Sequence, residues 1–171
     1  METRNFDHCF VCGSRNEAGL RLEIVSGNGE ARAEFQPDAR WEGYPGVVHG
    51  GVLGALLDDL MFHAIYSVIK QLAVTASIEV RFRRPARIGA RLFCQARIGE
   101  PGARRAAPAP RGHPAAAPGP VGARVSGQGR FVDAEGEIRN QDGRLIATAR
   151  SKYIIMSQAK MDDFMGNGDV L

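Results

Sequence analysis

Residues 49–70, HGGVLGALLDDLMFHAIYSVIK, decide the fold of this chain. Their apolar side chains recur at steps of three and four residues, which is the period of a helix with one buried stripe. The stripe consists of Leu53, Leu56, Leu57, Leu60, Ala64 and Val68. This stretch therefore predicts one long helix that packs its stripe against another apolar surface.

Shorter segments on both sides of the helix show the alternation of apolar and polar residues that is typical of half-buried strands. Before the helix, residues 20–35 carry two such runs around the turn SGNG at 26–29, which predicts a hairpin. After it, strands are predicted at 75–83, 92–98, 131–138 and 145–155, the last two joined through Asp142-Gly143. Together these elements predict an α+β fold, in which an antiparallel sheet wraps around one long central helix.

A low-complexity segment at residues 101–129 interrupts this pattern. It contains six of the nine prolines and no aromatic residue. Such a composition buries too little apolar surface to form a core, so we expect a Pro/Ala/Gly/Arg insert within a single domain spanning 1–171. A shifted reading frame is the alternative, and resequencing the gene distinguishes the two.

Composition and charge narrow the class of protein. A net charge of +3 over 171 residues argues against a general nucleic-acid binder. The N-terminal METRNFDHCF lacks the apolar segment of a secretory signal, and no stretch is expected to match the ~18 apolar residues of a membrane span. We therefore expect a cytoplasmic protein without nucleic-acid or membrane partners, and with reduced cysteines.

The start of the helix carries the first candidate chemistry. The backbone N–H groups there have no intrahelical acceptors, and the helix dipole adds partial positive charge. Glycine allows a carbonyl to approach the backbone, so Gly50 and Gly51 are candidate donors to an oxyanion. His49 is a candidate binding or structural residue rather than a general base, because a helix N-terminus disfavours the imidazolium form.

Asp58 is the candidate acid, base or nucleophile. It shares one flank of the helix with three small residues, and a carboxylate on such a flank is costly to bury without a partner. The small residues are Gly51, Gly54 and Ala55. Asp59 is expected to point farther from the stripe. The alternative is that both aspartates form a solvated pair on an exposed face.

The spacing of these candidates predicts a dimer. Gly50 and Asp58 are eight residues apart, which separates them by about 12 Å along a helix axis. One reacting carbon cannot contact both groups. Two subunits that each contribute one group across a two-fold axis would satisfy the geometry.

Cys9 and Cys12, with His8 adjacent, have the spacing of half a zinc site. A structural zinc site needs four ligands, and a second cysteine pair is missing. We therefore expect neither a metal nor another cofactor.

Two motifs carry a resemblance to a known family. The run VVHGGVLGALLDD at 47–59, followed by a strand ending in RFRRPARIG at 81–89, resembles the hotdog-fold thioesterases, especially the PaaI-like and THEM-like acyl-CoA thioesterases. The N-terminal CFVCGSRNEAGLRL at 9–22 is similar to an opening found in one branch of these proteins. The resemblance covers residues 6–100 and 130–155 and implies the hotdog fold.

The resemblance also implies a site. The N–H of Gly50 would polarise the thioester carbonyl, and Asp58 of the opposing subunit would act as base or nucleophile. Thr75 would position water, with Ser77 nearby and Gly51 contacting the substrate. The implied assembly is a homodimer or a dimer of dimers.

A basic run lies beside this implied site, and it suits the phosphates of coenzyme A if it faces outward. It comprises Arg81, Arg83, Arg84, Arg87 and Arg91. A solvated strand face is an equally good interpretation. Many relatives carry an asparagine before HGG, whereas this chain has WEGYPGVV at 41–48.

Two other functions remain open. One is a hotdog dehydratase of hydroxyacyl thioesters, which relies on a catalytic histidine in a different arrangement. The other is a non-catalytic module that binds acyl-CoA for regulation and would not need the carboxylate. The combination of HGG with Asp58 favours hydrolysis.

Overall fold

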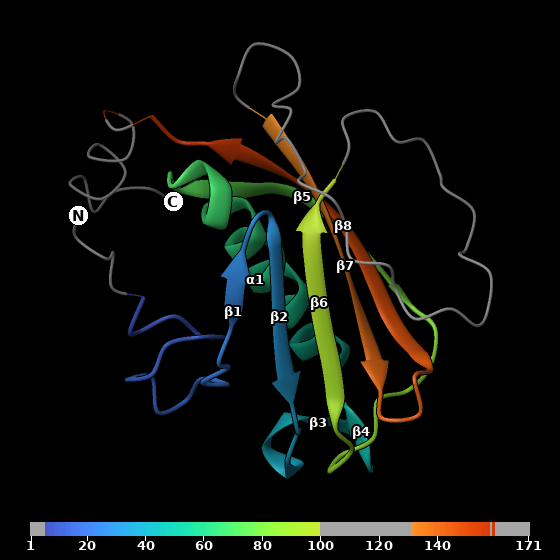
Figure 1. Ribbon diagram of the computed structural model, residues 1–171. Coiled ribbons are helices and arrows are strands. Elements are labelled where there is room, and N and C mark those ends of the chain that lie inside the picture. Colours follow the sequence, from blue (N-terminus) through green and yellow to red (C-terminus); the bar gives the residue numbers. More distant parts are fainter. Residues whose placement is uncertain (1–5, 100–130, 158, 160–171) are drawn as a thin grey trace.

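The computed structural model describes residues 6–99, 131–157 and 159. The predicted insert at 101–129 lies outside the described residues. The described part consists of one curved sheet, a small two-stranded sheet and a single long helix (Figure 1).

The large sheet is antiparallel throughout, and its six strands follow the order β1-β2-β6-β7-β8-β5. The strands are β1 (Val25–Gly27), β2 (Glu30–Phe35), β5 (Ala73–Phe82), β6 (Leu92–Ile98), β7 (Phe131–Asn140) and β8 (Leu145–Ile155). All the predicted long strands are present. β1 and β5 form the two edges of the sheet.

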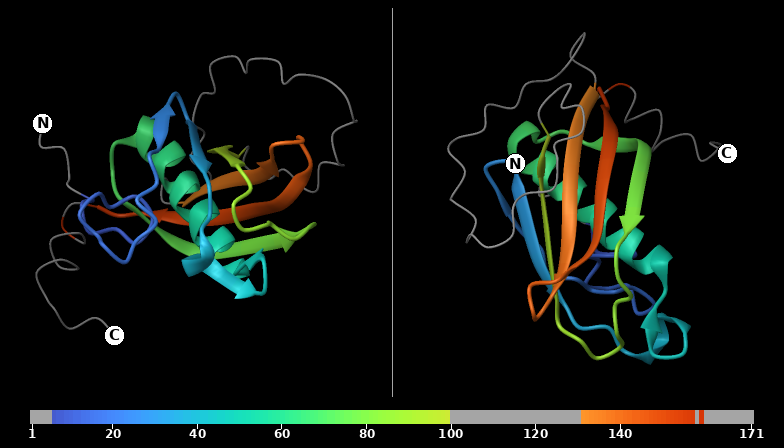
Figure 2. Two further views of the ribbon diagram at one scale, coloured as in Figure 1. Left: turned by 90° about the horizontal axis from the view of Figure 1, so that it is seen from below. Right: turned by 90° about the vertical axis from the view of Figure 1, so that its right-hand side faces the viewer.

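The helix α1 (Gly50–Ile69) lies against the concave face of this sheet, as the views of Figures 1 and 2 show. Seven of its residues are buried: Leu53, Leu56, Leu57, Leu60, Met61, Ala64 and Ile65. Val68, which was predicted on the stripe, is 38% exposed because it lies in the last turn of the helix. The predicted α+β hotdog architecture is confirmed.

The same helix corrects one expectation from the sequence. By length and by a mean hydropathy of 1.6 in its most apolar part, α1 resembles a membrane span. In the fold it is the core helix, and the sheet covers its apolar stripe. Core helices and membrane spans share this composition because both are surrounded by apolar groups.

The predicted N-terminal hairpin is present, but its first strand begins at Val25 instead of Leu20. The N–H groups of Leu20 and Leu22 donate to the carbonyl oxygens of Phe10 and Val11, both at 2.8 Å. Residues 20–22 therefore contact the N-terminal loop instead of extending β1.

The predicted loop between β2 and α1 contains short regular elements. These are a 3₁₀ turn, η1 (Ala39–Trp41), and the small sheet of β3 (Glu42–Tyr44) and β4 (Val47–Val48). They deliver the chain to the start of α1, where the N–H of His49 donates to the carbonyl of Trp41 at 2.8 Å.

β5 is present as predicted, but its apolar face is only partly buried. Ile78 and Phe82 are 39% and 55% exposed. Opposite this face α1 presents glycines. A Cβ built on Gly50 would lie 3.3 Å from the side chain of Phe82, and a Cβ built on Gly54 would lie 4.0 Å from that of Val80. Because the helix has no side chains there, it leaves this edge of the sheet incompletely covered.

Candidate functional site

Asp58 lies half-buried on α1, where it faces β5 and β8. Its Oδ1 accepts hydrogen bonds from Thr75 Oγ1 and from the hydroxyl of Tyr153, both at 2.8 Å. No residue in the described part of the chain donates to Oδ2. One carboxylate oxygen is thus held in place while the other remains available to a substrate or a water.

Thr75 reaches Asp58 because of a bulge in β5. Thr75 pairs with Tyr153, but Ser77 pairs with Lys152, so Ala76 is the extra residue. Directly paired residues share one face of a sheet, and this places Thr75 on the helix side. The resemblance implied Thr75, but the bulge that orients its side chain is not apparent from the sequence.

Tyr153 was missed by the sequence analysis. Its ring is buried, with 1% of the residue exposed, and its hydroxyl also lies 2.7 Å from the carbonyl oxygen of Asp58. Burial and the charge of Asp58 raise the pKa of this hydroxyl, which keeps it a hydrogen-bond donor. The only signal in the sequence was its place in the alternating run of β8, which does not reveal its partner.

The start of α1 leaves the N–H of Gly50 without an acceptor among the described residues. His49 caps the helix, since its Nδ1 accepts from the N–H of Gly51 at 3.0 Å. An acceptor at Nδ1 requires the tautomer with its proton on Nε2. The N–H of Val52 donates to the carbonyl of His49 at 3.0 Å, whereas the N–H of Gly50 has no acceptor among the described residues. Of the two candidate glycine donors, Gly50 is therefore the one left unpaired.

Gly50 and Asp58 are not brought together within one chain. They lie on the same straight helix, eight positions apart, and thus about 12 Å from each other along its axis. The two groups belong to different ends of any cleft that runs along α1.

The remaining predicted residues lie at or beyond β5. Ser77 shares the outer face of the sheet with Lys152, so within one chain it does not face Asp58. Arg83 and Arg84 are exposed, and Arg84 Nη1 donates to the carbonyl of Leu145 at 3.0 Å. Neither arginine forms an ion pair with a described residue, so both guanidinium groups remain available for an anion.

Asp59, which was expected to point farther from the apolar stripe than Asp58, lies in a second cluster of polar side chains. Only 14% of its side chain is exposed, and burial raises the pKa of its carboxyl. Its neighbours are Cys9, Cys12 and His63. Burial is also the main cause that raises the pKa of the Cys12 thiol and lowers that of His63. The two aspartates therefore do not form a solvated pair.

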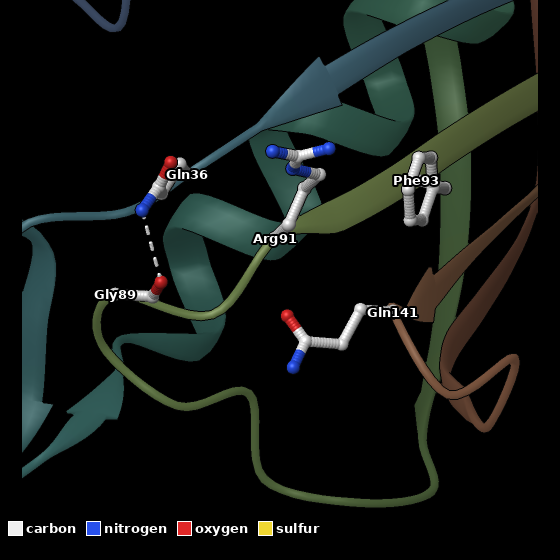
Figure 3. A pocket seen from close by; sticks show the side chains of 5 residues that line it. All are labelled: Gln36, Gly89, Arg91, Phe93 and Gln141. Atoms are coloured by element: carbon white, nitrogen blue, oxygen red, sulfur yellow. Dashed lines mark hydrogen bonds between the residues drawn. The ribbon is translucent and has the colours of Figure 1, made fainter.

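A surface pocket of about 360 Å³ lies apart from these groups (Figure 3). Its lining residues are Gln36, Gly89, Arg91, Phe93 and Gln141, and the amide of Gln36 donates to the carbonyl of Gly89 at 3.1 Å. A second pocket of about 290 Å³ is lined by residues 20–23, by residues 34–36, and by Asp38, Arg40 and Trp41. Neither pocket includes Asp58 or Gly50.

The comparisons with known proteins agree with the fold. Residues 45–107 match the model of the thioesterase superfamily. Among curated proteins, no sequence matches the chain. The solved structures with a similar fold include thioesterase superfamily member 2 of zebrafish, with 18% identity, coverage of 79% of this chain and 81% of that one, and a TM-score of 0.59.

Two bacterial structures are similar to the same degree. The PaaI protein of E. coli, from the phenylacetic acid degradation operon, is 22% identical over 79% of this chain and 83% of its own, with a TM-score of 0.58. A hypothetical thioesterase of Streptococcus pneumoniae, solved with coenzyme A, is 17% identical over 80% and 87%, with a TM-score of 0.60. Residues 45–107, which include the start of α1, thus match the thioesterase superfamily, and the shared architecture shows that the chain has the hotdog fold of these structures.

Proposed function

We propose that the chain is an acyl-CoA thioesterase whose active site is completed by a second copy of the chain. The observation that carries the proposal is the carboxylate of Asp58, which Thr75 and Tyr153 hold through Oδ1 while Oδ2 has no donor among the described residues. A held carboxylate of this kind suits a general base or a nucleophile.

The free N–H of Gly50 supplies the complementary group. In the proposed reaction it donates to the thioester oxygen and stabilises the negative charge that develops there. Asp58 of the other subunit either takes a proton from the attacking water or attacks the carbonyl carbon itself. In the first route the tetrahedral intermediate collapses, the C–S bond breaks, the carboxylic acid is released, and the coenzyme A thiolate takes up the proton held by Asp58. In the second route the attack of Asp58 expels the coenzyme A thiolate, which takes up a proton from solvent. Water then hydrolyses the mixed anhydride, which releases the carboxylic acid and restores Asp58.

The edge strand β5 supports the two-subunit arrangement. Its outer edge pairs with no other described strand, and Ile78 and Phe82 are exposed beside it. Exposed apolar residues on a free sheet edge favour pairing with another strand. Two copies that pair β5 with β5 would bring Gly50 of one chain toward Asp58 of the other, which one chain cannot do.

Coenzyme A is the proposed leaving group for two reasons. Two proteins of the same fold were solved with a related ligand. The protein from Streptococcus pneumoniae contains coenzyme A, and the protein from Streptococcus mutans contains acetyl-CoA. In this chain Arg83 and Arg84 are exposed and form no ion pair with a described residue, and guanidinium groups bind phosphates well.

Release of free thiol from short, long and aromatic acyl-CoAs tests the activity. We expect the wild-type chain to hydrolyse at least one class, and Asp58→Asn to lower kcat by about 10²- to 10⁴-fold. Asp142→Asn, in the exposed turn after β7, is the matched control and should leave kcat unchanged. If no thioester is hydrolysed but acyl-CoA binds, the chain is a binding module instead.

Subunit mixing tests the shared site. Asp58→Asn and Gly50→Val each disable both sites of a homodimer, but their heterodimer retains one site with both groups intact. Random assembly of equal amounts should restore about a quarter of the wild-type activity. A mixture that remains inactive although heterodimers are present would show that the two groups do not act across subunits.

A further inference from the structure

We propose that Cys9, Cys12, Asp59 and His63 bind a zinc ion that fastens the N-terminal loop to α1. The loop supplies two sulfur ligands, and the helix supplies a carboxylate and an imidazole from positions i and i+4. The site is separate from the proposed active site, because Asp58 faces β5 and β8 whereas Asp59 faces the loop.

Three distances between the ligand atoms are close to those around a tetrahedral ion, with one oxygen of Asp59 near Cys9 and the other near His63. Zinc bonds of about 2.0 to 2.3 Å give a tetrahedron with edges of about 3.4 to 3.8 Å. His63 Nε2 lies 3.5 Å from Cys12 Sγ and 3.7 Å from Asp59 Oδ2, and Cys9 Sγ lies 3.6 Å from Asp59 Oδ1. The ligand atoms of the two cysteines and Asp59 all lie within 4.8 Å of one another.

Asp59 Oδ2 provides an independent indication. It is the one side-chain oxygen or nitrogen of the described residues that is buried and has no hydrogen-bond partner. His63 Nε2, at 3.7 Å, is too distant to donate to it. A buried carboxylate oxygen without a partner is costly, and a bound cation between Asp59 and His63 would remove this cost.

The cysteine turn is shaped to present both sulfurs to the helix. The N–H of Val11 donates to Cys9 Sγ at 3.4 Å, an interaction that would support a metal-bound thiolate. A Cβ on Gly13 would collide with the carbonyl oxygens of Asp7 and Cys9, so this tight turn accepts only glycine after the second cysteine. Phe6 packs against the rings of Phe62 and His63, which holds the loop on the same side of α1.

The ligand set indicates the metal and its role. Two thiolates, one imidazole and one carboxylate form a mixed set that suits zinc, and four protein ligands close a tetrahedral site. A closed site has no position for a substrate, so the ion is structural. No metal was expected from the sequence because a second cysteine pair is missing. In the fold, Asp59 and His63 from the middle of α1 supply two further ligands instead.

Metal analysis of the full-length protein tests the proposal. After zinc loading and removal of loosely bound metal, we expect about one zinc per chain. Exchange with Co²⁺ should give the absorption of tetrahedral cobalt together with a thiolate-to-cobalt charge-transfer band. Metal-free protein that contains a Cys9–Cys12 disulfide, or a cobalt form without the thiolate band, would overturn the proposal without any variant.

Matched variants then assign the ligands. Cys12→Ser, Asp59→Asn and His63→Ala should each weaken zinc binding by about tenfold to a hundredfold or more, as read by competition with a chromogenic chelator. The controls are Cys94→Ala, Asp58→Asn and His8→Ala, which change the same residue types outside the cluster and should bind zinc like the wild type. Loss of zinc in His8→Ala with retention in His63→Ala would refute the assignment.

Discussion

Replacing Tyr153 with phenylalanine removes one hydroxyl and keeps the buried ring. That hydroxyl lies 2.8 Å from Asp58 Oδ1, and a hydrogen bond to a charged group contributes about 1.5 to 3 kcal/mol. If the bond holds the carboxylate in its reactive position, its loss lowers kcat by roughly ten- to a hundredfold, at about 1.4 kcal/mol per factor of ten. The free energy of unfolding should fall by about 1.5 to 3 kcal/mol, because the same bond to a charged group also stabilises the folded state.

The assay is steady-state hydrolysis of the best acyl-CoA at saturating substrate, with urea unfolding of the same samples. Tyr66→Phe is the control, since Tyr66 lies on the same helix as Asp58 but its hydroxyl forms no hydrogen bond with a described residue. Thr75→Val removes the other donor to Oδ1, so the double variant should lose less than the two single losses combined. A Tyr153→Phe enzyme with kcat within twofold of wild type and an unchanged fold would refute the positioning role.

Two further outcomes follow from charge and burial. The double variant Arg83→Ala/Arg84→Ala should raise KM for acyl-CoA about tenfold, and the increase should be smaller at high salt. The control is Arg32→Ala on β2, where the arginine is paired with Glu30 at 2.9 Å, and it should leave KM unchanged. Burial raises the pKa of Cys94 to about 12, so the folded state holds this proton more tightly than the unfolded state. The contribution of Cys94 to stability is then constant below about pH 8.5 and falls by up to about 1.4 kcal/mol per pH unit above it. Cys94→Ala should make the slope in urea unfolding less steep by this amount.

The edge position of β5 shows where a correct local pattern was incomplete. The alternation from Thr75 to Arg83 predicted a strand with one buried face, and the strand is present. The bulge at Ala76 and the glycines opposite Val80 and Phe82 were not visible in that pattern. A bulge depends on how two strands pair, and coverage depends on what the helix presents to them.

What the sequence alone determined is the part that local backbone geometry controls. The three- and four-residue period of 50–69 required a helix with a buried stripe, and the period of two in its flanks required strands. The small-residue flank around Asp58 and the unpaired N–H groups at Gly50 follow from the helix itself. These features depend on residues a few positions apart, so the linear pattern contains them.

Only the tertiary structure decided which distant groups meet. Tyr153 contacts Asp58 across 95 positions, and Cys12 and His63 are separated by 51. Such contacts depend on strand register and on how the N-terminal loop packs against α1, which no local period encodes. For that reason Asp59, the less promising aspartate in the sequence, became the centre of a buried cluster, while Asp58 obtained the two donors that hold its carboxylate.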